Sequence, residues 1–219
     1  NNVFFGIPDV ITSSTAPKHL LKADRLTTVS EQGELILEKG RYIVPKKIKQ
    51  VGKKELDQHW RAKLFIHNAP HAILAYLGHI KKYQYTHEAM IDKKIKKIVI
   101  GSMKEVTNGV IRAKYVSNKF AKYYMNKEIR RFSNKLLFDP ISRVAREPIR
   151  KLGKENRIVL ALRVAQWNKE QPNNIATGVK AALKFYSKQD AESIYLQNLR
   201  KKFDDDEVLE MISGIERTD

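Results

Sequence analysis

Hydrophobic and polar positions follow two different periodicities along the chain, and the periodicity changes near Lys54. Before it, short β-prone runs alternate with turn-forming residues. Residues 33–37 and 41–44 are two such runs, and the short glycine-containing link between them predicts a β-hairpin. Pro45 and the basic stretch after it are expected to form a connector. The first 50 residues are therefore expected to be an extended segment with a hairpin.

After Lys54 the apolar spacing becomes helical. One long helix is predicted from apolar residues that share a face: Ile91, Ile95, Ile98, Val99, Met103, Val106 and Val110. On the opposite face we expect a solvated stripe of lysines: Lys93, Lys94, Lys96 and Lys97. Ser117 is expected to cap the next helix, which runs through Phe120, Tyr124 and Phe132.

Further helices are predicted toward the C-terminal end. Asp139 and Pro140 predict a helix start, with the acid as the cap and the proline at the first helical position. More helices are expected near residues 155–168, 175–186, 189–202 and 205–213. The predicted fold is therefore mainly α, with a small β element within residues 1–50 and a multi-helix domain over residues 51–219.

Composition narrows the chemistry. The 219 residues include no cysteine, which excludes disulfides, cysteine-ligated metals and thiol catalysis. No apolar run approaches the roughly 18 residues that a membrane span needs, so none is expected. The formal net charge is +18, from 42 Lys and Arg against 24 Asp and Glu. Such a chain attracts polyanions, which include nucleic acid, acidic lipid and phosphorylated metabolites.

Several motifs are missing from the sequence. It contains neither of the glycine-rich phosphate-binding loops, so it lacks a dinucleotide fingerprint of its own. It contains no H-E-x-x-H or G-x-S-x-G motif, and its six histidines show no metal-binding spacing beyond His67 and His71. No bound metal is therefore expected.

One helical segment gathers polar residues on an otherwise apolar surface. At about 100° per residue, Lys63, His67, His71 and Asn68 fall on the same side of the helix. Apolar surroundings lower the pKa of a lysine, which suits it to act as a general base. Pro70 has no N–H to offer the carbonyl four residues earlier, so a kink is expected there. Periodicity alone favours a different interpretation, in which the lysine extends to solvent and the other polar groups satisfy a helix–helix contact.

These residues belong to a recognisable motif. Lys63, Asn68 and His71 match the K-x-x-x-x-N-x-x-H pattern of the polyol-specific long-chain dehydrogenases, the mannitol dehydrogenase family. The string from Lys63 to Gly78 resembles the mannitol-1-phosphate 5-dehydrogenase branch. Pro8-Asp9-Val10-Ile11 resembles the V-D-R-I segment of the family, with Asp9 at the acidic position. Residues 142–152 resemble the R-V-x-R-x-P-L-R-K-L segment of that branch.

The resemblance implies a two-domain oxidoreductase with a 6-phosphogluconate-dehydrogenase-like helical domain. An N-terminal Rossmann domain would bind NAD, and this chain would be the C-terminal substrate domain. Lys63 would be the general base, Asn68 would hold the substrate oxygen and His71 would orient the substrate. The implied reaction converts mannitol 1-phosphate to fructose 6-phosphate in the cytoplasm. The chain by itself is expected to be inactive.

Basic side chains recur at helical spacing after Pro140. Arg143, Arg146 and Arg150 lie at i, i+3 and i+7, which places them on one face of a single helix, with Lys151 beside them. Three guanidinium groups suit a phosphate monoester, although a solvated stripe has the same pattern. With the resemblance, Arg146 and Lys151 become the strongest expected substrate contacts, followed by Arg150, Arg143 and Asp9.

Two alternative functions remain open from the sequence. Within the same family, the chain could belong to a mannitol 2-dehydrogenase or a hexuronate reductase. In another class, the net charge would suit a basic helical domain that binds nucleic acid, but no helix-turn-helix, zinc finger or RNA-binding motif is present.

Overall fold

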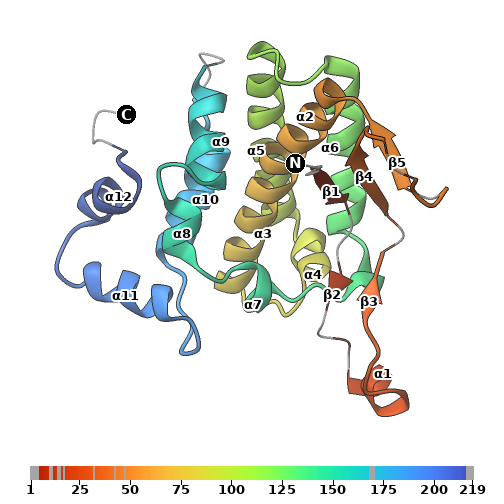
Figure 1. The fold of residues 1–219 in the computed structure, drawn as a ribbon. Helices are drawn as coiled ribbons and strands as arrows, with labels where there is room; N and C mark the ends of the chain where they lie inside the picture. Colours follow the sequence, from red (N-terminus) through yellow and green to blue (C-terminus); the bar gives the residue numbers. More distant parts are fainter. Residues whose placement is uncertain are drawn as a thin grey trace.

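The computed structural model describes residues 5–9, 12–13, 16, 18–31, 33–41, 43–46, 48–167 and 171–215. Within them, a bundle of helices surrounds helix α3 (Ala69–Ile80), whose residues 69–78 are all buried. Figure 1 shows α3 in the middle of the bundle, with a small sheet on one side and α11 and α12 on the other. The expected mainly helical fold with a small N-terminal β element is confirmed.

The other helices of the domain follow one another along the chain. They are α2 (Lys53–Ala62), α4 (Thr86–Ile91), α5 (Lys93–Arg112), α6 (Asn118–Phe132), α7 (Ile141–Val144), α8 (Pro148–Leu152), α9 (Arg157–Gln166), α10 (Asn173–Leu183), α11 (Ala191–Leu199) and α12 (Asp205–Ser213), with a 3₁₀ turn η2 at Lys135–Leu137. Helix α3 packs mainly against α10 and α5.

The N-terminal sheet has three strands in the order β1 (Gly6–Asp9), β4 (Glu34–Glu38) and β5 (Ile48–Val51). Strand β1 is antiparallel to β4, and β5 is parallel to it. A separate antiparallel pair joins β2 (Thr12–Ser13) to β3 (Val29–Ser30). The three-stranded sheet buries one apolar residue from each strand against Leu56 of α2: Ile7, Ile36 and Val51.

The predicted hairpin between residues 33–37 and 41–44 is wrong. The partners of β4 are β1 and β5, and Ile43 and Val44 lie outside any strand. Ile43 is fully exposed, whereas Val51 is buried in the sheet core. The strand therefore forms at Ile48–Val51, within the expected connector, because that segment buries an apolar residue against distant parts of the chain. The first 50 residues also contain a short helix where an extended segment was expected, α1 (Lys18–Ala23).

The long helical face after residue 91 is confirmed with one exception. Ile95, Val99 and Met103 are buried along α5, and the four predicted lysines are exposed. Ile91 is different: it ends α4 and is exposed, because Asp92 interrupts the helix and caps α5 by accepting from the backbone of Lys94 and Ile95. Ser117 caps α6 as predicted, accepting from the backbone N–H of Phe120.

Before Pro70, where a kink was expected, the structure has a π-helical segment. Residues Lys63–Asn68 (η1) are π-helical and join α2 to α3 without a break. In a π-helix each carbonyl bonds to the N–H five residues later, so a carbonyl four residues before a proline still has a possible partner. Such segments are frequent at functional sites. This one contains Lys63, His67 and Asn68.

The segment after residue 139 differs from the single arginine-bearing helix expected. Two short helices, α7 and α8, are separated by Glu147 in the left-handed conformation (φ 59°). The ring of Pro148 disfavours helical geometry at the residue before it, which explains the break. Asp139 does not cap α7: Pro140 occupies the cap position, and Asp139 pairs with other side chains.

Gly109 allows α5 and α9 to pack closely. A Cβ at Gly109 would overlap the backbone carbonyl of Val164. We therefore expect Gly109→Ala to lower the free energy of unfolding by about 1–3 kcal/mol, despite the better helix propensity of alanine. Urea denaturation would measure this. Gly52→Ala is the control, because nothing lies within 4 Å of its Cβ; equal stability of the two variants would contradict the expectation.

Candidate functional site

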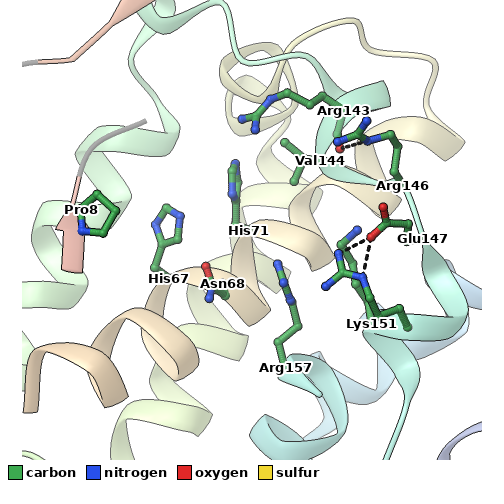
Figure 2. A pocket seen from close by; sticks show the side chains of 11 residues that line it. Pro8, His67, Asn68, His71, Arg143, Val144, Arg146, Glu147, Lys151 and Arg157 are labelled. Atoms are coloured by element: carbon green, nitrogen blue, oxygen red, sulfur yellow. Dashed lines mark hydrogen bonds and ion pairs between the residues drawn. The ribbon is translucent and has the colours of Figure 1, made fainter. Parts of the chain in front are cut away.

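A pocket of about 520 Å³ opens where the continuous helix 53–80 faces the segment from α7 to α9 (Figure 2). One wall carries polar side chains of η1 and α3, and the other carries basic side chains of α7, α8, α9 and the turn between α7 and α8. The pocket is lined by Pro8, His67, Asn68, His71, Arg143, Val144, Arg146, Glu147, Arg150, Lys151 and Arg157.

His71 is fixed in the pocket wall by a buried carboxylate. Its Nε2 lies 2.8 Å from Oδ2 of Asp139. The other oxygen of Asp139, Oδ1, accepts a hydrogen bond from Arg143. Burial lowers the pKa of His71, so the ring is neutral at neutral pH and Nε2–H donates to Asp139. Burial would raise the pKa of Asp139, but its hydrogen bonds with His71 and Arg143 and the positive charge of Arg143 lower it to about 2. Nδ1 of His71 is left as an acceptor.

His67 is held in a parallel way, by a carboxylate from another helix. Its Nδ1 lies 2.5 Å from Oε2 of Glu128 on α6, and Glu128 is fully buried. The rings of His67 and His71 are 5.0 Å apart, and both pack against Phe132. The two histidines therefore form one rigid aromatic cluster on this wall.

Lys63 lies at the start of the π-helical segment and reaches the N-terminal sheet. Its Nζ donates to the carbonyl oxygen of Pro8 at 2.6 Å. Pro8 itself lines the pocket, whereas Lys63 is not one of the lining residues. The strand that contains Pro8 thus fixes the position of the Lys63 amino group beside the pocket.

The basic wall carries more positive charge than the nearby carboxylates balance. Arg143 pairs with Asp139, and Arg150 pairs with Glu147. Within the described residues, Arg146, Lys151 and Arg157 make no ion pair. Lys151 is 4% exposed, and burial, together with the charges of Arg157 and Arg150, lowers its pKa to about 8. This wall is therefore suited to an anionic ligand.

Arg157 is a pocket residue that the sequence reasoning missed. It is the first residue of α9, after the cap Asn156, whose side chain accepts from the backbone N–H of Arg157. A cation is unfavourable at the positive end of a helix dipole, and burial and Arg150 also lower the pKa of Arg157. An arginine directly after an asparagine that caps a helix is unfavourable for stability, and this pattern could have identified Arg157 as a functional residue.

The structure brings together most of the predicted site residues. Six of them line the pocket: Asn68, His71, Arg143, Arg146, Arg150 and Lys151. Lys63 does not line the pocket, but it donates a hydrogen bond to Pro8, which does. Asp9 is in β1, next to Pro8 in the chain, but its side chain lies outside what the structure describes. The arginines thus lie in one cavity with His71, although they do not share one helix.

Fold and pocket together define a helical domain with a basic pocket beside a buried histidine pair. The family comparison names that domain: the model of the mannitol dehydrogenase C-terminal domain matches residues 55–214. This chain belongs to the mannitol dehydrogenase family.

Individual relatives agree with this assignment. The chain is 35% identical over 204 residues to mannitol-1-phosphate 5-dehydrogenase of Buchnera aphidicola subsp. Acyrthosiphon pisum (strain Tuc7), covering 92% of the chain and 53% of that protein. It is 34% identical over 162 residues to the enzyme of the same name from Caldanaerobacter subterraneus subsp. tengcongensis, covering 74% of the chain and 42% of that protein. The chain thus spans about half the length of these relatives.

A solved structure supports the fold. The chain resembles mannitol 2-dehydrogenase of Pseudomonas fluorescens, solved as a ternary complex with NAD and D-mannitol, with a TM-score of 0.72 and 21% identity over 95% of this chain and 45% of that one. No helix among the described residues is both long and apolar enough to cross a membrane. Nothing in these comparisons supports the nucleic-acid-binding alternative.

Proposed function

We propose that this chain is the substrate domain of a cytoplasmic, NAD-dependent polyol-phosphate dehydrogenase that converts mannitol 1-phosphate to fructose 6-phosphate. One observation carries the proposal: Arg146, Lys151 and Arg157 form no ion pairs within the described residues, and they face the histidine wall across one pocket. A phosphate dianion at the basic wall would balance this charge, and its polyol chain would extend toward His71 and Asn68.

In the proposed reaction, Lys63 takes the proton of the substrate hydroxyl as that carbon is oxidised to a carbonyl. The carbonyl oxygen of Pro8 positions the Nζ atom for this transfer. Asn68 contributes amide donors to the oxygen on which negative charge develops. His71, neutral and held by Asp139, accepts a hydrogen bond from a neighbouring hydroxyl through Nδ1.

NAD, when bound, supplies the acceptor for the hydride that leaves the substrate carbon. The chain has no glycine-rich phosphate loop, so its residues do not fit the pyrophosphate of a dinucleotide. The dinucleotide would be held by a Rossmann domain, the partner that the family resemblance implies. What this chain contributes is the proton acceptor and the walls of the substrate pocket.

Phosphate binding tests the proposal and has a defined pH dependence. Lys151 is an ammonium below its pKa of about 8, and phosphate is mostly a dianion above about pH 6. We expect the affinity of the chain for mannitol 1-phosphate to be highest between these values. Above about pH 8 it should fall by up to tenfold per pH unit, because binding then requires Lys151 to take up a proton. Isothermal titration calorimetry at several pH values measures this.

The matched variants are Lys151→Met and Lys154→Met. Lys151→Met loses a charged hydrogen bond worth about 1.5–3 kcal/mol, so it should bind mannitol 1-phosphate roughly 10- to 150-fold more weakly. Its affinity should also no longer fall above about pH 8, because the titrating amine is gone. Lys154 is exposed three residues away, and its variant should bind like the original chain. Equal affinity for mannitol and mannitol 1-phosphate would reject phosphate recognition and favour a dehydrogenase of unphosphorylated polyols.

A further inference from the structure

His67 is a buried polar residue of the pocket to which the proposed reaction assigns no role. It is 6% exposed and lies in the same wall as Asn68 and His71. Its ring contacts Phe132 and His71 at centroid distances of 5.4 and 5.0 Å. An apolar side chain of similar size would fill the same space, so the choice of an imidazole needs another explanation.

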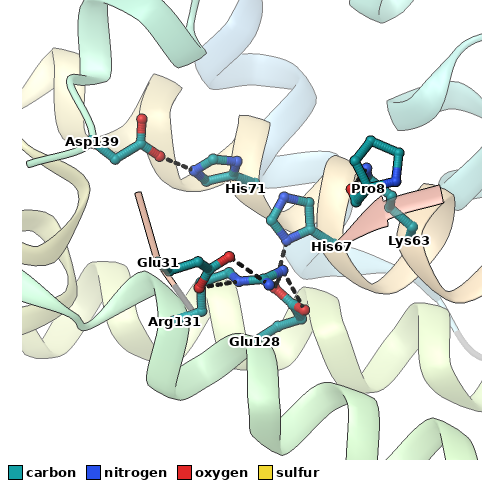
Figure 3. Close-up of polar contacts among 8 residues, drawn as sticks. All are labelled: Pro8, Glu31, Lys63, His67, His71, Glu128, Arg131 and Asp139. Atoms are coloured by element: carbon teal, nitrogen blue, oxygen red, sulfur yellow. Dashed lines mark hydrogen bonds and ion pairs between the residues drawn. The ribbon is translucent and has the colours of Figure 1, made fainter. Parts of the chain in front are cut away.

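The partners of His67 determine which of its nitrogens carries a proton. Arg131 donates from Nη1 to both oxygens of Glu128, at 2.9 and 3.1 Å, and pairs with Glu31 at 2.6 Å (Figure 3). Two hydrogen bonds from the permanently charged Arg131 favour the ionised form of the buried Glu128. An ionised carboxylate only accepts hydrogen bonds, so Nδ1 of His67 must donate to it, whatever the charge of the ring.

This arrangement leaves Nε2 as the polar atom that His67 offers to the pocket. Figure 3 shows the second ring nitrogen on the side of the ring away from Glu128. Within the described residues, Nε2 has no hydrogen-bond partner. The position of Nε2 is fixed, because Glu128 holds one edge of the ring and two neighbouring aromatic rings pack against it.

We propose that His67 contacts the substrate, through a hydrogen bond between Nε2 and one hydroxyl of the polyol chain, and that Glu128 and Arg131 are positioning residues for it. This inference rests on the proposed function. A hydroxyl both donates and accepts, so the bond forms with either charge state of the ring. Figure 2 shows the basic side chains across the pocket from His67 and His71. A phosphate at the basic wall would direct the carbon chain toward the two histidines, which would then meet different hydroxyls.

The first test needs no substrate. Nitrogen-15 NMR of the histidine side chains reports which ring nitrogen is protonated. In the full chain we expect His67 to keep its proton on Nδ1, whereas Glu128→Gln should populate both tautomers of the neutral ring. A neutral His67 protonated on Nε2 in the unaltered chain would overturn the inference, even if the pocket binds phosphate.

The second test uses His67→Phe, which keeps an aromatic ring but removes both nitrogens. We expect about three- to tenfold weaker binding of mannitol 1-phosphate and affinity for inorganic phosphate within about twofold of the original. His79→Phe is the matched control: His79 lies on α3 outside the pocket, against Phe185 at 4.7 Å, and its variant should bind both ligands normally. Equal loss for both ligands with His67→Phe would show that the pocket had been distorted, and would overturn the inference.

Monodeoxy analogues of mannitol 1-phosphate identify the hydroxyl. The analogue that lacks the hydroxyl bound by His67 should bind equally to the original chain and to His67→Phe, while the other analogues keep the roughly three- to tenfold difference. A difference that persists with every analogue would contradict a direct contact. If inorganic phosphate fails to bind the original chain, the proposed function fails separately, since the NMR result does not depend on it.

Discussion

Lys63→Ala is expected to lower kcat of the holoenzyme that contains this chain by about 10²- to 10⁴-fold, with little change in KM. A general base acts mainly in the transition state, so its loss affects the chemical step more than ground-state binding. The structure supports this role, because Nζ is held beside the pocket by the carbonyl of Pro8. Steady-state kinetics of polyol-phosphate oxidation would measure both constants.

Lys63→Arg separates proton transfer from charge. Arginine keeps the positive charge and can still donate to Pro8, but it does not lose its proton at accessible pH. It should therefore be nearly as inactive as alanine. Lys54→Ala, an exposed position on the same continuous helix, should leave both constants unchanged. A substantial rate with Lys63→Arg would remove Lys63 from the role of base.

Local patterns predicted the long helices well, because their burial follows directly from spacing. The face of α5 from Ile95 to Val110 and the Ser117 cap of α6 needed no information from elsewhere in the chain. The N-terminal sheet was predicted poorly, because β4 pairs with β1 and β5. Such pairing depends on which distant segment buries its apolar residue, and spacing within one segment does not reveal that.

The site was predictable in its residue types and not in its geometry. The motif resemblance selected Lys63, Asn68 and His71, and the recurring arginines indicated an anion. The carboxylates that fix the two histidines come from distant parts of the chain, Glu128 on α6 and Asp139 before α7. The angular reasoning for the arginines failed at the turn between α7 and α8, since it assumed an unbroken helix across the residue before a proline.

Asn68→Ala is expected to lower kcat/KM of the same holoenzyme by about 10²- to 10³-fold. The Asn68 amide lines the pocket and has no hydrogen-bond partner within the described residues, so its donors are available to a ligand. Removing one donor to a developing oxyanion costs about 2.7–4 kcal/mol. Most of the loss should appear in kcat, because the charge on the oxygen is largest in the transition state.

Two variants distinguish this role from packing. Asn68→Asp keeps the size of the side chain but places a negative charge beside the forming oxyanion, so it should be at least as inactive as alanine. Asn108→Ala, at an exposed position of α5, should retain full activity. Urea denaturation should show Asn68→Ala within about 0.5 kcal/mol of the original stability, since the amide has no partner in the described structure to lose. A loss of activity below about tenfold, or one matched by a comparable loss of stability, would reduce Asn68 to a structural residue at the end of the π-helical segment.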